Sequence, residues 1–224
     1  MPARAAGRRA RRRWPLRLLV TVVVVAAFLF GVDYAAQQVA QSQLAAHIRQ
    51  STSASSASAT IHSFPFVYDV LAKGSVAEID ATANGVPAGP LQLQQVTVSA
   101  HQVQIDRHQL IADHRVHLTA IASATATVTV TAPALSAVAG VPVSLSPGNV
   151  VSATVRGVTV PAVIGVEGQT LTLTVAGARL LSVDLQQSPV VPACAMTLVV
   201  HPGELQVSCT VAPVPPSVIA ALSQ

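Results

Sequence analysis

The chain has 224 residues, of which 51% are hydrophobic, 10% charged and 3% aromatic. This balance excludes a charge-rich disordered protein and predicts a folded part with an aliphatic core. The net charge of +4 comes from the first seventeen residues, which hold seven arginines; beyond Asp33 there are six basic and eight acidic residues. A folded part with a charge of about −2 lacks the basic surface that nucleic-acid binding requires, so we expect no nucleic-acid partner.

An apolar segment follows the basic tail. Residues 18–32 are uncharged, and the run 16–36 is long enough to cross a bilayer if Arg17 extends its charge to the interface. The arginines before the segment predict a cytosolic N-terminus, and Trp14 and Tyr34 are spaced to lie at the two interfaces. The pattern predicts a single-pass protein of the plasma membrane whose C-terminal domain is extracytoplasmic.

A cleavable signal peptide is the alternative interpretation of the same segment. Asp33 and Tyr34 occupy the place where small residues would mark a cleavage site, so an uncleaved signal anchor is favoured. We expect four regions: a basic cytosolic tail over residues 1–15, a transmembrane helix over 16–36, a helix with a Ser/Ala-rich connection over 37–60, and a β-rich lipid-binding-like domain over 61–224.

The segment from Tyr34 to Gln50 contains no glycine or proline, and its apolar residues recur at helical spacing. It is predicted to be a helix, which can be continuous with the membrane span. Residues 51–59 are a low-complexity run of serine and alanine, typical either of a flexible connection or of a frayed helix end. The sequence leaves these two open.

From Ser75 onward the sequence is strand-like, with alternating apolar and polar residues. Asn84-Gly85 predicts a turn after the first strand, and Pro133–Ala139 and Pro216–Leu222 predict short helices. The fold class is therefore α+β, mostly β, with about ten or eleven strands in antiparallel sheet. The further strands are expected at 91–99, 102–106, 115–121, 124–131, 150–155, 159–166, 170–175 and 180–185.

Two cysteines flank a predicted hairpin. Cys194 and Cys209 stand on either side of the turn residues 201–204 and have the parity of the apolar residues on their strands. In an exported domain, this arrangement is most simply a cross-strand disulfide. A redox pair or a metal site is the alternative, but no Cys-x-x-Cys spacing or matching histidine pair is present.

The sequence contains no phosphate-binding glycine loop, nucleophile elbow or paired carboxylates, so we expect no catalytic residues and no enzyme activity. His101, His108, His114 and His117 lie within seventeen residues, but their positions do not share one strand face. We expect surface histidines, no metal and no cofactor.

Three of the seven aromatic residues, Phe64, Phe66 and Tyr68, fall within five positions. Together with Val67, Val70 and Leu71 they form either a plug that closes one end of the sheet or a hydrophobic tip that contacts a membrane or gates a lipid site. Both interpretations stay open at this point.

The run IHSFPFVYDVLAKGSVAEIDATANGV, from Ile61 to Val86, resembles the actinobacterial LmeA-like family of extracytoplasmic phospholipid-binding proteins. The Ala-rich helix before it, the Pro133 helical turn and the final Val/Leu-rich hairpin extend the resemblance. It implies a fold similar to tubular lipid-binding domains, in which a curved antiparallel sheet wraps around a helix and leaves room for acyl chains.

The implied function is non-catalytic: the protein holds or shuttles an anionic phospholipid, of the phosphatidylinositol type, in the cell envelope, and serves an envelope-biosynthesis partner. The alternative is a membrane-tethered structural or protein-interaction β domain without a ligand. The candidate lipid-contacting residues are Phe64, Phe66, Val67, Val70, Leu71 and Ile79.

Overall fold

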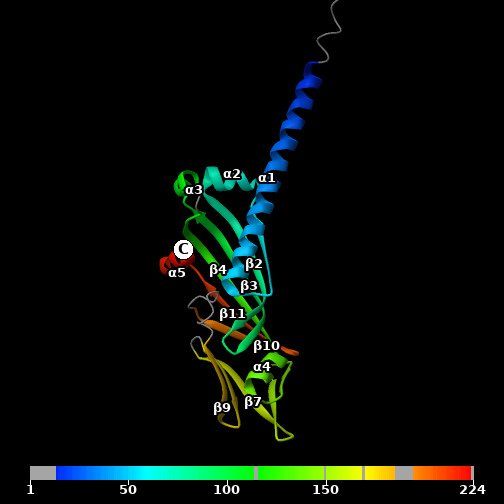
Figure 1. Cartoon of the computed structure of the whole chain (residues 1–224), viewed down its shortest axis with the longest axis vertical. Coiled ribbons are helices and arrows are strands. Elements are labelled where there is room, and N and C mark those ends of the chain that lie inside the picture. Colours follow the sequence, from blue (N-terminus) through cyan, green and yellow to red (C-terminus); the bar gives the residue numbers. More distant parts are fainter. Residues whose placement is uncertain (1–13, 114–115, 149, 168–169, 185–193, 223–224) are drawn as a thin grey trace, which may run out of the picture.

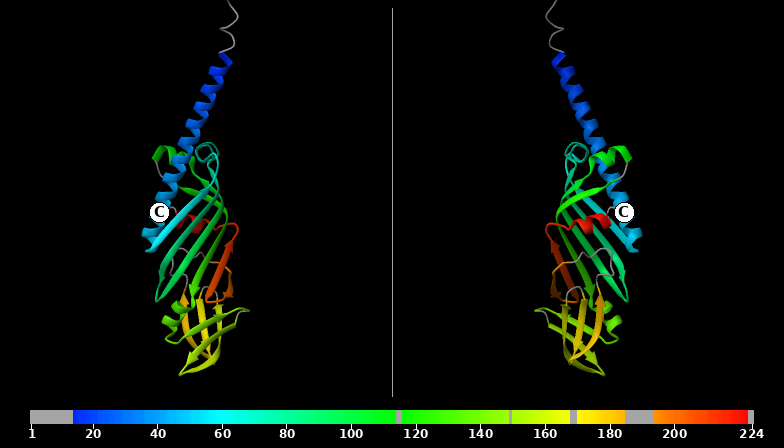
Figure 2. Two further views of the ribbon diagram at one scale, coloured as in Figure 1. Left: turned by 90° about the vertical axis from the view of Figure 1, so that its right-hand side faces the viewer. Right: turned by 90° about the vertical axis from the view of Figure 1, so that its left-hand side faces the viewer.

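The computed structural model describes residues 14–113, 116–148, 150–167, 170–184 and 194–222. One long helix, α1 (Trp14–Thr52), projects from a mostly β domain in which two antiparallel sheets follow one another along the long axis (Figure 1). The second half of α1 lies along the first sheet, and the second sheet is at the far end of the molecule (Figure 2). The mostly β fold class is confirmed, although the strands divide into two sheets where one had been expected.

The first sheet, sheet A, has the strand order β1-β2-β3-β4-β11-β10, with neighbours antiparallel. Its strands are β1 (Ser56–His62), β2 (Ser75–Ala88), β3 (Leu91–Ile105), β4 (Leu118–Thr131), β10 (Met196–His201) and β11 (Glu204–Val211). Short helices cover its end nearest the start of α1. These are α2 (Phe66–Tyr68) with its π-helical continuation η1 (Asp69–Lys73), and α3 (Arg107–Asp113), while α5 (Pro216–Leu222) contacts β4.

Sheet A has one apolar and one polar face, because side chains alternate along each strand and opposite residues share a face. The polar face is rich in threonine and serine, such as the cross-strand pair Thr125 and Thr210. We call the apolar one the inner face. Its central residues are Ala57, Ala59 and Ile61 on β1, Ile79, Ala81 and Ala83 on β2, Val96, Val98 and Ala100 on β3, Ala124, Ala126 and Val128 on β4, Val207, Cys209 and Val211 on β11, and Met196 and Leu198 on β10.

Two residues with positive φ shift the buried positions along the β2–β3 hairpin. At Gln102 (φ 52°) the alternation changes, so that Val103 is buried although it has the parity of exposed His101. Gly85 (φ 64°) marks a similar point on β2, and a Cβ there would lie 2.6 Å from Ser55 Oγ. This conformation and this close contact both favour glycine. The expected turn at Asn84-Gly85 is therefore wrong: Gly85 is a kink inside a strand that continues to Ala88.

Sheet B has the order β5-β6-β7-β8-β9 and is likewise antiparallel. Its strands are β5 (Val143–Ser146), β6 (Val150–Val155), β7 (Val158–Glu167), β8 (Thr170–Val175) and β9 (Ala178–Asp184). Helix α4 (Ala132–Ala139) precedes it, capped by the Thr131 hydroxyl, and buries Leu135 completely. One aliphatic core, which includes Leu93, Leu171 and Leu205, joins sheet B to the lower half of sheet A.

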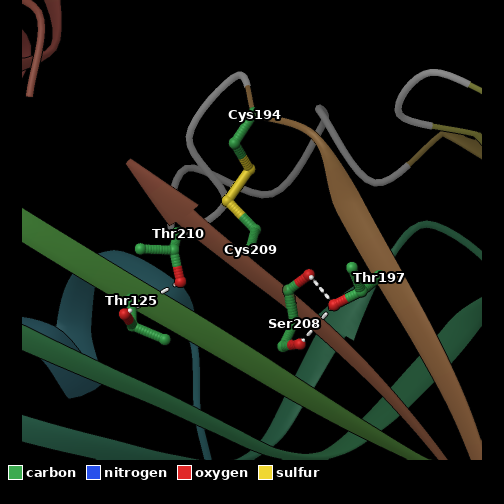
Figure 3. Close-up of a disulfide and its surroundings, with 6 residues drawn as sticks. All are labelled: Thr125, Cys194, Thr197, Ser208, Cys209 and Thr210. Carbon is green, nitrogen blue, oxygen red and sulfur yellow. Dashed lines mark hydrogen bonds between the residues drawn. A yellow bond between two sulfur atoms is a disulfide. The ribbon is translucent and has the colours of Figure 1, made fainter. Parts of the chain in front are cut away.

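The C-terminal hairpin of sheet A is closed by a disulfide between Cys194 and Cys209, whose Cα atoms are 5.9 Å apart (Figure 3). Cys209 pairs with Met196 in the strand register, so Cys194 lies just before β10 and the link is diagonal. Thr197 and Ser208 pair on the opposite face, as the figure shows. The predicted hairpin and its disulfide are confirmed.

The structure also decides the Ser/Ala-rich stretch, which is neither a flexible connection nor only a frayed helix end. Helix α1 continues to Thr52, and Ser56 begins β1, which pairs with β2 along its whole length. The expected boundary at residue 61 falls inside this strand. The predicted short helices are present as α4 and α5, while α3 and β5 were not expected from the sequence. His114 and Arg115 lie outside the described residues.

Candidate lipid-binding site and the membrane-proximal rim

Helix α1 carries two different surfaces along its length. Among the described residues, the part of α1 from Leu19 onward contains an 18-residue stretch with a mean hydropathy of 2.2, and it is long and apolar enough to cross a membrane. From Leu19 to Val32 its large apolar side chains are exposed. The part after Asp33 instead lies against sheet A. Helix α1 therefore has an exposed apolar N-terminal part and a C-terminal part that packs against the β domain.

The junction between these two parts is made by Asp33, whose side chain is only 6% exposed. Its carboxylate accepts hydrogen bonds from the backbone N–H groups of Phe66 (3.0 Å) and Val67 (2.6 Å), the first residues of α2. A carboxylate satisfies such unpaired N–H groups and interacts favourably with the helix dipole. One turn earlier, Phe30 stacks on Phe64 with ring centroids 5.5 Å apart.

The segment after α2 is held by a second buried carboxylate. Asp69, 8% exposed, forms an ion pair with Lys73 (2.7 Å) and accepts a hydrogen bond from the Ser63 hydroxyl (2.6 Å). The hydrogen bond from Lys73, followed by that from Ser63, holds the pKa of Asp69 below its ordinary value, and Asp69 in turn raises the pKa of Lys73. The Lys73 ammonium also lies 5.5 Å from the centroid of the Tyr68 ring.

Gly74 ends the η1 turn in the left-handed conformation (φ 68°). A Cβ at this position would lie 2.8 Å from Arg107 Cγ, and the Gly74 carbonyl accepts a hydrogen bond from Ile105 N at 2.8 Å. Arg107 also donates to the carbonyl of Ala72. These contacts join the η1 turn to the start of α3 at one end of sheet A.

Five large apolar side chains are exposed at this end, and we call them the proximal rim. They are Phe64, Tyr68, Leu71, Ile111 and Val116. The lining of a depression of 730 Å³ at this end includes Leu71 and Ile111 together with Lys73, Arg107 and His108. An exposed apolar patch bordered by cations is typical of a surface that binds a partner or a membrane.

The inner face of sheet A and the facing side of α1 are both incompletely covered. On α1, the side chains of Ala36, Ala40, Leu44 and Ile48 are only half-buried. Ile48 packs against the aliphatic core shared with sheet B, and Ala40 packs against a second, upper core cluster, which includes Val76 and Val103. On the sheet, Ala59 and Ala81 are half-buried and belong to neither cluster. The apolar surfaces of α1 and of sheet A thus meet, and side chains on both stay partly exposed.

The candidate residues from the sequence divide into three groups. Phe64 and Leu71 are exposed on the proximal rim, and Phe66, Val67 and Val70 turn inward. Phe66 and Val70 join the upper core cluster, while Val67 also provides one of the N–H groups bound by Asp33. Ile79 is half-buried on the inner face beside Ala100. The aromatic segment is therefore buried on one side and exposed on the other.

Some contributors were not identified from the sequence. Asp33 had been noted only for its effect on a cleavage site, and its partners are more than thirty positions away. Ile111 and Arg107 lie on α3, a helix that was not predicted from the sequence. The small residues of the inner face carry a detectable signal, because alanine repeatedly occupies the apolar positions of alternating strands.

The fold and this site define the class of protein. A long helix with an exposed apolar part is followed by a β domain, and an incompletely covered apolar surface is shared by the helix and sheet A. A family model, described as LmeA-like phospholipid-binding, matches residues 31–224. The chain belongs to this family, as the resemblance in the sequence had indicated, and membership supports phospholipid binding. The chain has no significant match among curated proteins or among solved structures.

Proposed function

We propose that this protein is an uncleaved, single-pass membrane protein that holds an anionic phospholipid between α1 and the inner face of sheet A, outside the cytoplasm. It acts without catalysis and makes the lipid accessible to the machinery of envelope biosynthesis. The observation that carries the proposal is the half-buried apolar surface shared by α1 and sheet A, in a chain of a phospholipid-binding family.

The physical basis is burial of acyl chains. Each methylene removed from water contributes about 0.8 kcal/mol, so even a partly enclosed chain gains several kcal/mol. Alanines at Ala59, Ala81 and Ala100 leave volume that larger side chains would fill. Apolar surfaces with few polar groups are what lipid tails require, and polar groups at one end suit a headgroup.

The preference for an anionic headgroup is supported by cations at the proximal end. Lys73 and Arg107 line the depression there. Lys73 is paired with Asp69, whereas Arg107 donates to the Ala72 carbonyl and forms no ion pair within the described parts of the chain. A guanidinium is well suited to a phosphate, because its N–H groups match phosphate oxygens. Arg49, in the last turn of α1, lies away from this end.

The experiment uses the full chain, reconstituted in nanodiscs that contain a phospholipid with a photoactivatable acyl chain, either phosphatidylinositol or phosphatidylcholine. We expect crosslinks on the inner-face residues of β2, β3 and β4, with more from phosphatidylinositol. Ala100→Phe should remove these crosslinks by filling the surface, while Thr97→Phe, on the polar face of the same strand, should retain them.

Crosslinks confined to the apolar half of α1 in every variant would refute lipid binding at the inner face and favour the tethered domain without a ligand. Equal labelling by both lipids, with the same loss in Ala100→Phe, would keep the binding surface and refute the anionic preference.

A further inference from the structure

The depth of the proximal rim relative to a membrane follows from its position along α1. Trp14 and Tyr34 are separated by twenty residues, which at 1.5 Å per residue is about 30 Å, the thickness of the hydrocarbon core of a bilayer. With Tyr34 at the extracytoplasmic interface, as the proposed anchoring places it, Phe30 is four residues, or about 6 Å, inside the apolar layer.

Phe64 must then lie in the same layer. Its ring stacks on Phe30 with an interplanar angle of 10° and a centroid distance of 5.5 Å. The hydrogen bonds from the start of α2 to Asp33 hold the same segment to α1 just after Phe64. The β domain cannot retreat from the membrane without breaking both contacts.

The neighbours of Phe64 have the composition of a membrane interface. Tyr68 and Leu71 follow it at intervals of four and three residues, and Ile111 lines the same depression as Leu71. Phe64 is 67% and Ile111 62% exposed, an unfavourable state for such side chains in water. Arg107 and His108 border the same depression, where phosphate groups would meet them.

We infer that the proximal rim inserts into the leaflet that α1 enters on the extracytoplasmic side, with Phe64, Tyr68, Leu71 and Ile111 below the headgroups and Arg107 at their level. The inference depends on the proposed membrane anchoring by α1, but not on a lipid held at the inner face. The rim and the helix then form one membrane-bound unit, and the upper end of sheet A faces lipid directly.

The test places a single tryptophan at chosen depths in the full chain. Trp14 is the only native tryptophan, so Trp14→Phe provides a background without tryptophan. Reporters Leu71→Trp and Ile111→Trp probe the rim, Leu29→Trp probes α1, and Val163→Trp on exposed β7 of sheet B is the matched distant control. Each variant is reconstituted in nanodiscs with and without phosphatidylcholine brominated on its acyl chains.

We expect brominated lipid to quench Leu71→Trp and Ile111→Trp, with blue-shifted emission, and to leave Val163→Trp unchanged. Quenching of Leu29→Trp without quenching of the two rim reporters would overturn the rim insertion while leaving the anchor intact. Absence of quenching at Leu29→Trp would instead refute the anchoring on which the inference rests. Quenching of Val163→Trp equal to that of the rim would also overturn it, since sheet B would then lie on the membrane.

Discussion

Replacing Asp33 with alanine should release the α2–η1 segment from α1 without unfolding the β domain. The substitution removes both hydrogen bonds to the N–H groups of Phe66 and Val67. Loss of an acidic or polar cap costs about 0.5–2 kcal/mol, and hydrogen bonds to a charged group are worth about 1.5–3 kcal/mol each. We expect a local loss of about 2–4 kcal/mol, because the two bonds are accepted by the two oxygens of one carboxylate and are lost together.

Hydrogen exchange measures this loss directly. A local loss of about 2 kcal/mol corresponds to roughly 30-fold faster exchange, since 1.4 kcal/mol is a factor of ten. Exchange in the full chain in nanodiscs should therefore accelerate for peptides covering residues 66–73. Peptides from β8, in the distant core around Leu171 and Leu173, should be unchanged.

Asp106→Ala is the matched control, because Asp106 also accepts hydrogen bonds from two backbone N–H groups, those of His108 and Gln109, at the start of another short helix. It should accelerate exchange in α3 and not in residues 66–73. Unchanged exchange of residues 66–73 in Asp33→Ala would refute the argument that Asp33 fixes this segment to α1.

Three further predictions concern stability. Cys209→Ser should lower the free energy of unfolding by about 3 kcal/mol, because the disulfide to Cys194 closes a loop with a sequence separation of 15; denaturant titration checks this, and a loss equal to that caused by reductant alone is expected. Leu205→Ala, at a fully buried position, should cost about 2–5 kcal/mol, whereas Val199→Ala, at an exposed position of the same hairpin, should change stability by less than about 0.5 kcal/mol in the same titration. The pKa of Asp69 is lower in the folded chain than its ordinary value of 3.8, so the unfolded chain binds more protons near that pH. The stabilisation by Asp69 is therefore complete above pH 3.8 and is lost as the pH falls through the lower folded pKa. Asp69→Asn should abolish this part of the pH dependence of the free energy of unfolding.

Local patterns were sufficient where one element's own residues determine its structure. The one-sided β8, the hairpin around Pro202 and the helix after Thr131 follow from alternation, turn residues and capping, which act over a few positions. The Ser/Ala-rich β1 could not be identified in this way, because serine and alanine have low strand propensity. It is a strand because β2 pairs with it and α1 packs on it.

The division into two sheets was also beyond the sequence pattern. Strand β4 pairs with β11, and the five strands of sheet B are inserted between them in the chain. Alternation identifies each strand but not its neighbours, because a pairing between distant segments depends on the packing of the whole core. For the same reason, Asp33 could be noticed as an isolated acid but not assigned to the start of α2.

Two polar side chains of α1 lie at its junction with the β domain. Asp33 and Gln37 follow the exposed apolar run, and the polar groups of both would obstruct an acyl chain that moved from a leaflet toward the inner face. Both are instead bound to backbone groups of the β domain: Asp33 to the start of α2, and Gln37 Nε2 to the carbonyl of Ile61. A polar group satisfied in this way presents little unpaired polarity to its surroundings. The next side chains on this side, Ala36, Ala40 and Leu44, are small or aliphatic, so the apolar surface of α1 continues from the membrane-spanning stretch to sheet A. On the proposed function, the two polar residues that attach the domain to its anchor are thus also the ones whose pairing keeps the lipid path apolar.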